Sequence, residues 1–329
     1  MFIHRRRGWE IPESQVTPEH LVLNRRTLMA AAGAGTVLAP AAAQAQFWRR
    51  NEPADPWARL PATTPDLPPA MRNPRYRPDR AISPEREPVT YNNFYEFGSD
   101  KGVWSSAIRM PVRPWTIKID GLVEQPVELE VDDLIRRVGV EERVYRLRCV
   151  EAWAMTVPWT GFELSKMLEL AKPLSGTRYV RFETAQVPSV MTGLRQAWYP
   201  WPHVECCTMA EAMNELSFVP VGLFGRPLPP QNGGPIRVVF PWKYGFKSGK
   251  SIARITLTNE RPKSFWETLQ PNEYGFWANV NPEVPHPRWS QASERLIGTG
   301  ERVPTRLFNG YGEFVAGLYT NLQSERLWT

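Results

Sequence analysis

The middle of the chain is patterned mainly for short β-strands. Apolar residues alternate with polar ones in several stretches, which is the period of a half-buried strand. The stretches 115–119 and 127–131 flank a turn with a glycine and a proline, so we expect them to form a hairpin. Further strands are predicted over 144–150, 178–185, 236–240 and 251–260.

Helical patterns are fewer and short. Apolar positions closed by Gly139 predict a helix over 132–138, a second is expected over 164–171, and a third begins near Met209. Residues 186–207 show no regular pattern, and no structure is assigned to them. We therefore interpret the chain as one continuous α+β domain with many loops.

Proline content separates the N-terminal part from the body. The chain has 329 residues, of which 33 are proline, and a dense series between 50 and 88 excludes long helices. Residues 46–90 are therefore expected to be an extended arm packed on the body. Residues 91–329 are expected to form that body, with no linker that would divide it.

The first residues have the features of a targeting signal. Adjacent Arg25 and Arg26 precede an apolar run of small residues that ends in an A-x-A cleavage pattern at 43–45. This resembles a bacterial twin-arginine export signal, so residues 1–45 are predicted to be a signal peptide and the mature protein is expected in the periplasm. Because such proteins are exported folded, commonly with a cofactor in place, the resemblance also implies a cofactor.

Charge, cysteine and histidine content exclude several classes of site. The formal net charge of +6 is modest and no lysine or arginine run carries it, so no nucleic-acid partner is expected. The only cysteines are Cys149, Cys206 and Cys207, and adjacent cysteines rarely pair, so no disulfide framework is expected. Beyond residue 45 only His203 and His286 remain, which argues against an ordinary zinc site or a hydrolase triad.

Two polar turns have the composition of an anion site. YGFKSGKS at 244–251 nearly matches a phosphate-binding P-loop, but its first glycine stands one residue too late. The glycines could still expose backbone N–H groups, while Lys247 and Lys250 supply positive charge. PPQNGGP at 229–235, followed by Arg237, could converge with it on one bulky anion. Each turn alone is equally consistent with a solvated surface.

Cys149 follows a strand-like run and allows two interpretations. A lone cysteine is commonly a small buried hydrophobic residue. A reactive Cys149 would instead need a metal or a cation near its thiolate. Glu151 would face the same side as Cys149 if the strand continued two residues further, and would otherwise be a surface carboxylate.

Five stretches together resemble the molybdopterin enzymes of the sulfite oxidase family, and within it the bacterial periplasmic enzymes that reduce methionine sulfoxide in proteins. The resemblance covers most of the mature chain and implies a single mixed-sheet molybdopterin-binding domain. Only residues 186–207 depart from the family pattern. The stretches are NNFYEFGSDKG at 92–102, RVYRLRCVEAWAMTVPWTGF at 143–162, FET at 182–184, LPPQNGGPIRVVFPWKYGFKSGKSI at 228–252 and ANVNPEVPHPRWSQASER at 278–295.

The resemblance implies one Mo-molybdopterin per chain and assigns roles to eleven residues. Cys149 would be the thiolate ligand of molybdenum, because a soft ligand suits a redox-active metal. Glu151 would be the second catalytic residue, as an active-site carboxylate. Ser248, Gly249 and Lys250 would hold the cofactor's phosphate. The remaining expected cofactor contacts are Asn92, Tyr95, Glu96, Thr184, Asn232 and Arg237.

The same resemblance implies the reaction and the partners. Oxygen would pass from methionine sulfoxide in an oxidised periplasmic protein to molybdenum, leaving the thioether. Electrons would come from a haem-containing membrane subunit, since this chain has no haem motif such as CxxCH. Two alternatives stay open: another sulfoxide or sulfite molybdoenzyme of the family, and a cofactor-free periplasmic binding protein in which Cys149 is part of the core.

Overall fold

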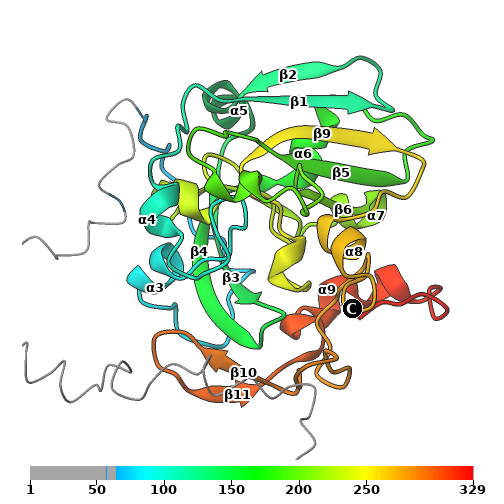
Figure 1. The fold of residues 1–329 in the computed structure, drawn as a ribbon. Helices are drawn as coiled ribbons and strands as arrows, with labels where there is room; N and C mark the ends of the chain where they lie inside the picture. The colour runs from blue at the N-terminus through cyan, green and yellow to red at the C-terminus, as the bar shows by residue number, and fades with distance from the viewer. Residues whose placement is uncertain (1–56, 58–63, 329) are drawn as a thin grey trace, which may run out of the picture. The chain divides into compact units, whose positions relative to one another are not determined.

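The computed structural model describes Trp57 and residues 64–328, which form two mixed β-sheets connected by short helices and long loops (Figure 1). The strands of the first sheet are, in spatial order, β2 (Val127–Glu130), β1 (Thr116–Gly121), β9 (Ile252–Thr258), β5 (Tyr179–Thr184) and β6 (Val204–Thr208). Those of the second are β11 (Arg302–Pro304), β10 (Ser293–Leu296), β4 (Trp153–Glu163), β7 (Phe218–Leu223) and β8 (Arg226–Pro227), with β3 (Glu141–Arg148) along the other edge of β4.

The predicted α+β class with mixed sheets is confirmed. The β1–β9 and β10–β4 pairs are parallel, and the other strand pairs of the described residues are antiparallel. The expected hairpin forms from β1 and β2, in which Ile117 faces Leu129 and Ile119 faces Val127. In Figure 1 the first sheet lies at the top and the β10–β11 hairpin at the bottom, with β3 and β4 between them.

The helices are short, and none in the described part of the chain is long and apolar enough to cross a membrane. The α-helices are α3 (Arg86–Thr90), α4 (Trp104–Ala107), α5 (Val131–Val138), α6 (Leu164–Glu169), α7 (Met209–Ala212), α8 (Phe265–Leu269) and α9 (Gly312–Val315). The 3-10 turns are η3 (Thr192–Arg195), η4 (Pro230–Asn232), η5 (Gly245–Lys247), η6 (Leu307–Gly310) and η7 (Ala316–Tyr319).

Helix α5 shows how local sequence sets the ends of an element. The Glu130 side chain accepts hydrogen bonds from the backbone N–H groups of Asp132 and Asp133, two of the groups that a helix start leaves unpaired. Two aspartates lie in its first turn and two arginines in its last, which matches the helix dipole. Gly139 ends it with a φ of 76°, a conformation that glycine adopts without strain. The predicted helix over 132–138 is confirmed.

Strand β4 is the longest strand, and the sequence pattern did not reveal it. Nearly all of its residues are buried, so apolar and polar positions do not alternate, and Pro158 lies inside it. It nevertheless pairs with β3 along one edge and with β10 and β7 along the other. Gly161 allows the closest approach to β7, because a Cβ there would lie 2.1 Å from the Val219 carbonyl oxygen.

Two further segments differ from expectation. Residues 186–207 contain η3 and the start of β6, whose Val204–Cys207 are all buried and therefore lack a strand period. The buried strand predicted over 236–240 is wrong. Its backbone is bonded alternately to two neighbours, with Val239 paired to Phe218 of β7 and Val238 N–H donating to Gly249 O, so only an isolated bridge forms.

The segment that precedes α3 lies along β3 and β4. The Asn73 N–H donates to Glu142 O at 2.7 Å, and the Ser83 N–H donates to Thr156 O at 2.9 Å. The limits of the predicted arm, 46–90, stay a prediction. Residues 46–56 and 58–63 of that arm, and the predicted signal peptide 1–45, lie outside the described residues.

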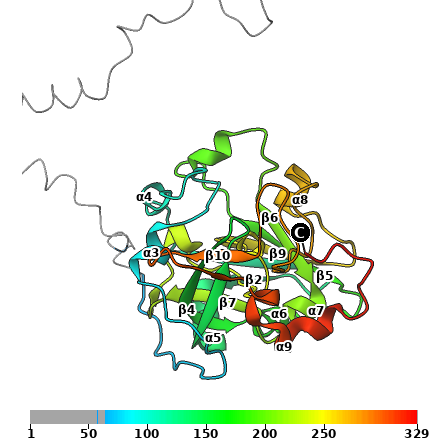
Figure 2. The ribbon, with the colours of Figure 1, turned by 90° about the horizontal axis from the view of Figure 1, so that it is seen from below.

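The C-terminal segment packs against α7. Asn214 Nδ2 donates to Phe314 O in α9 at 3.0 Å, and the Tyr319 hydroxyl donates to Glu211 Oε1 at 2.7 Å. Figure 2 shows α9 near α7. The last residues are therefore bonded directly to the polar part of the core.

Candidate functional site

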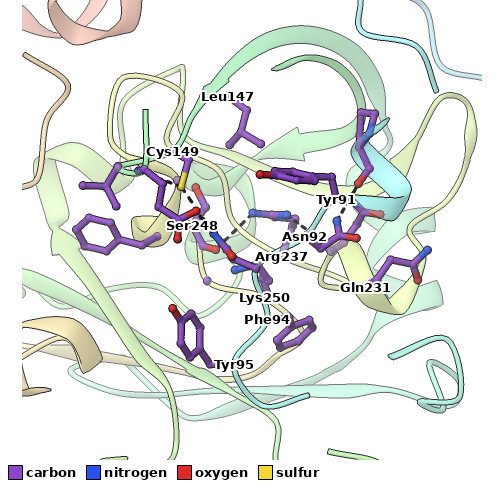
Figure 3. A pocket seen from close by; sticks show the side chains of 18 of the residues that line it. Tyr91, Asn92, Phe94, Tyr95, Leu147, Cys149, Gln231, Arg237, Ser248 and Lys250 are labelled. Carbon is purple, nitrogen blue, oxygen red and sulfur yellow. Dashed lines mark hydrogen bonds between the residues drawn. The ribbon is translucent and has the colours of Figure 1, made fainter. Parts of the chain in front are cut away.

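A deep cavity lies among residues 88–96, the turn between β3 and β4, and the loops around 231–237 and 245–250 (Figure 3). It contains about 1040 Å³ of empty space, part of which is its open mouth. Segments distant in sequence thus meet around one space. The eleven residues singled out from the sequence all line it: Asn92, Tyr95, Glu96, Cys149, Glu151, Thr184, Asn232, Arg237, Ser248, Gly249 and Lys250.

Cys149 lies in a tight turn directly after β3. Its N–H donates to Trp153 O at 2.9 Å, and the Ala152 N–H donates to Cys149 O at 3.1 Å. Ala152 has a φ of 60°, a left-handed conformation that non-glycine residues adopt rarely. Strand β3 ends at Arg148, so the condition under which the pleat would place Glu151 on the side of Cys149 is not met. The turn, rather than the pleat, brings Glu151 to the side of the sulfur.

The turn is fixed from behind by the segment before β10. Trp289 Nε1 and Gln291 Nε2 both donate to the Val150 carbonyl oxygen, at 2.7 and 2.8 Å. The Arg295 N–H donates to Ala152 O at 2.9 Å. The carbonyl groups of the turn are thus held from outside the cavity, which leaves the Cys149 side chain on the cavity wall.

The Cys149 thiol is buried, at 6% exposure. Burial, together with the neighbouring Glu151 carboxylate, raises the pKa of the Cys149 thiol to about 12. The side chain is therefore a neutral thiol near neutral pH unless a positive centre stabilises its thiolate. A bound metal ion is such a centre.

A polar network faces the sulfur. Asn93 Nδ2 lies 3.7 Å and the Glu151 N–H nitrogen 3.5 Å from Cys149 Sγ. Glu151 Oε2 is 2.6 Å from Lys101 Nζ and 2.9 Å from Trp153 Nε1. Burial alone would raise the pKa of Glu151, but Lys101 and Trp153 hold it below its usual range. Glu151 is therefore an ionised carboxylate beside the thiol.

Two cations line the cavity without an anionic partner. Arg237 Nη1 donates to Asn232 O at 2.8 Å and Nη2 to Ser248 O at 3.4 Å, but its buried Nε has no partner. Burial lowers the pKa of Arg237 to about 10 and that of Lys250, with Arg237 beside it, to about 8. In the described part of the chain, no carboxylate lies within 4.0 Å of either group. A bound anion would supply the missing charge.

Two amide side chains present free acceptors. Asn92 Nδ2 and Asn232 Nδ2 both donate to Pro88 O at 2.8 Å. Their Oδ1 atoms are buried and have no hydrogen-bond partner. Because unpaired buried acceptors are unfavourable, this pair is suited to the N–H donors of a bound heterocycle.

Backbone packing brings the two polar turns together. Gly233 has a φ of 87°, and a Cβ there would lie 2.7 Å from Lys250 Cβ. The Ser251 N–H donates to Gly233 O at 2.9 Å. The turns at 229–235 and 244–251 therefore converge, as the sequence suggested.

Lys247 is a correction to the sequence argument. It does not line the cavity. Its side chain is fully buried, and its Nζ lies 3.0 Å from Glu205 Oε2. Glu205 also approaches His203, which lies on the cavity wall 3.7 Å from Glu96 Oε1. Lys247 balances a buried carboxylate instead of contributing charge to the cavity.

Asn93 and Lys101 are two polar residues near Cys149 and Glu151 that the sequence analysis missed. Both belong to NNFYEFGSDKG, the stretch that already supplied Asn92, Tyr95 and Glu96. Nothing in the local pattern distinguishes Asn93 from Asn92, and the contact of Lys101 with Glu151 spans distant parts of the chain. The only sequence signal for Lys101 was its positive charge, which is complementary to that of Glu151.

Three comparisons relate the chain to known proteins. The family model described as the oxidoreductase molybdopterin binding domain matches residues 106–266. The protein-methionine-sulfoxide reductase catalytic subunit MsrP of Pseudomonas syringae pv. tomato is 46% identical over 319 residues, covering 94% of this chain and 95% of that protein. The crystal structure of the sulfane dehydrogenase SoxCD from Paracoccus pantotrophus aligns over 52% of this chain and 43% of that chain, with 18% identity. The TM-score of that alignment, 0.42, is too low to indicate a shared function.

Proposed function

Because the chain belongs to the family of protein-methionine-sulfoxide reductase catalytic subunits, which are molybdopterin oxidoreductases, we propose that Cys149 is its molybdenum ligand. The protein is accordingly a molybdopterin-dependent reductase of methionine sulfoxide. One observation carries the assignment of the site. A single cavity holds a buried thiol, two cations that form no ion pair within the described chain, and two unpaired amide acceptors.

The residues present fit the cofactor. Arg237 and Lys250, with Ser248 and Gly249 beside them, would hold the phosphate, because a buried arginine and a partly buried lysine without an ion pair favour a bound anion. Asn92 and Asn232 would accept hydrogen bonds from the pterin. Contacts with the cofactor are proposed as well for Tyr95, Glu96 and Thr184, which lie on the same wall.

Reduction of a sulfoxide to a thioether and water consumes two electrons and two protons. When bound, the molybdenum centre supplies the oxygen-atom and electron transfer. The chain supplies position and protons. Asn93 Nδ2 faces the sulfur, and Glu151 Oε2 is held by Lys101 and Trp153. Glu151 is an ionised carboxylate and holds no proton of its own, so we assign it to relaying protons from solvent water toward the departing oxygen.

Electrons would come from a second subunit, as the term catalytic subunit implies for this family. We propose that this subunit is a haem-containing membrane protein. We also propose that residues 1–45 are a twin-arginine signal, removed after export of the folded protein to the periplasm. The oxidised periplasmic proteins that carry methionine sulfoxide would be its substrates.

Metal analysis tests the site. Protein is expressed with its leader in a bacterium that makes molybdopterin, and molybdenum is counted by mass spectrometry. We expect about one molybdenum per chain, and none in Cys149→Ser. Cys206→Ser is the matched control, because Cys206 is buried in the core at 1% exposure and does not line the cavity.

Three results would contradict the proposal. Folded wild-type protein without molybdenum would restore the cofactor-free binding protein as the explanation of the cavity. Equal molybdenum loss in both cysteine variants would show that core damage, not loss of a ligand, removes the metal. Sulfite turnover faster than sulfoxide reduction would instead indicate a sulfite-oxidising enzyme of the same fold family.

A further inference from the structure

A second hollow adjoins the cofactor cavity. It contains about 930 Å³ of empty space, part of it open to solvent, which is within the range of about 300–1,000 Å³ that drug-sized ligands occupy. Four residues line both spaces: Tyr95, Glu151, Trp266 and Tyr274. The hollow, which we call the outer groove, therefore opens directly onto the wall that carries Glu151.

The outer groove has an amphipathic lining. Its inner side is aromatic, with Tyr95 packed edge-on against Trp266 at 4.9 Å between ring centroids and against Tyr199 at 5.9 Å. Its rim is polar, with the exposed Gln270 and with Arg288, whose charge is neutralised by Glu273 at 2.7 Å. Such a surface offers stacking area and hydrogen bonds but no net charge. It fits an uncharged, extended peptide backbone better than an anionic ligand.

An exposed tryptophan extends this surface outward. Trp198 is 70% exposed, and its ring centroid lies 5.9 Å from that of Tyr199, which lines the groove. Trp198 lies just after η3, in the segment that departs from the family pattern. A large aromatic side chain left in water beside a groove indicates a binding surface.

We propose that the outer groove binds the polypeptide on either side of the methionine sulfoxide, in extended form, with Trp198 as an apolar contact for a residue next to the sulfoxide. This inference rests on the proposed function. Its basis is the shared wall: a sulfoxide side chain that reaches Cys149 must leave its own backbone in the outer groove. The substrate class is therefore a flexible chain segment rather than a free amino acid or a folded surface.

Two substrates test the groove with the molybdenum-loaded enzyme and a chemical reductant. One is a single methionine sulfoxide residue with blocked ends, and the other is a peptide of about seven residues, which reaches about 23 Å when extended. We expect a lower KM for the peptide at similar kcat. Trp198→Ala should raise the KM for the peptide by about threefold to tenfold and leave the blocked residue unchanged.

Leu174→Ala is the matched control, since Leu174 is an exposed apolar residue at 43% exposure beside Leu122, which follows β1, and does not line either space. Binding of a labelled sulfoxide peptide is followed in parallel by fluorescence anisotropy. Weaker binding to Trp198→Ala than to Leu174→Ala would support the groove even if turnover were absent, in which case the proposed function alone would fail.

Three results would overturn the groove while leaving the reductase function intact. The first is equal kcat/KM for the two substrates in the wild-type enzyme. The second is an unchanged peptide KM in Trp198→Ala. The third is normal peptide kinetics in Trp198→Ala combined with slower reduction by the partner subunit, which would assign the surface to the electron donor.

Discussion

The pair Arg237 and Lys250 shows how individual residues indicate a missing ligand. A buried cation is stable when a carboxylate or several acceptors surround it. Arg237 has two backbone carbonyl partners, and Lys250 Nζ lies 5.6 Å from the ring of Phe94. Burial lowers the pKa of both groups. A phosphate bound between the two groups would raise both pKa values, because its negative charge stabilises the charged forms of Arg237 and Lys250.

Arg237→Met removes one of these cations while keeping an unbranched side chain. We expect molybdopterin to bind about tenfold to a hundredfold more weakly, because hydrogen bonds to charged groups contribute about 1.5–3 kcal/mol. The measurement is molybdenum and pterin content after dilution and gel filtration. Arg181→Met, in the middle of β5 with Glu183 as partner and outside the cavity lining, is the control. Full cofactor retention in Arg237→Met would rule out its role at the phosphate.

At the scale of residues, the sequence predicted which side chains line the cavity but not the pairs that they form. All eleven residues taken from the family resemblance line one cavity. Asn93, Lys101 and the misplaced Lys247 depend on pairings between segments far apart in the chain. Lys247 pairs with Glu205 across the core, and no local pattern distinguishes it from Lys250, three residues later.

At the scale of elements, a polar link joins the parallel strands β1 and β9. Asp120 accepts from Thr256 Oγ1 at 2.9 Å and from Arg254 Nη2 at 2.8 Å, and Asp120 and Thr256 are register partners. Burial alone would raise the pKa of Asp120, but these bonds hold it below 3.8. The ionised form is therefore favoured by folding.

The stability change in Asp120→Asn should depend on pH. A lowered folded pKa contributes stability above the unfolded value of 3.8, and the contribution is lost as pH falls below it. We expect the free energy of unfolding to fall by about 1–3 kcal/mol near pH 7 and by clearly less near pH 3. Urea unfolding at both pH values measures this. An equal loss at both would mean that packing, not charge, is the cause.

Elements were predictable where one face is exposed. In strands β1 and β9, apolar buried residues largely alternate with polar exposed ones. In helix α5, the buried residues recur with the helical period. Strands β4 and β7 are buried on both faces, and so is nearly all of β6. Their sequences therefore have no period to read, and only the completed sheets define them. The turn at Cys149 was not predicted for another reason. Its Ala152 adopts a left-handed conformation that alanine rarely takes.

At the scale of the whole molecule, the hydroxyl of Tyr319 links the C-terminal segment to the core by hydrogen bonds. Tyr319 accepts from Trp242 Nε1 at 2.7 Å and donates to Glu211 Oε1 at 2.7 Å. Glu211 is also paired with the buried Lys243. Helix α7, the loop after 240 and the chain end are thus joined in one polar cluster.

Tyr319→Phe should therefore destabilise the protein without changing the cavity. Loss of the hydroxyl leaves buried partners unsatisfied, at a cost of about 1–3 kcal/mol. Urea unfolding and the rate of proteolysis near the C-terminus measure it, with molybdenum content unchanged. Tyr179→Phe is the control, because the Tyr179 hydroxyl has no hydrogen bond in the described chain. Similar stability in both variants would show that the cluster contributes little.

The bonds that hold the Cys149 turn also set an order of events during synthesis. Trp289, Gln291 and Arg295 enter the ribosomal tunnel long after Cys149 has left it, yet they fix the carbonyl groups of residues 150 and 152. A nascent chain therefore carries its thiol on an unsupported turn until almost the whole polypeptide has emerged. We infer that truncated products of interrupted translation lack the contacts that hold this turn in place.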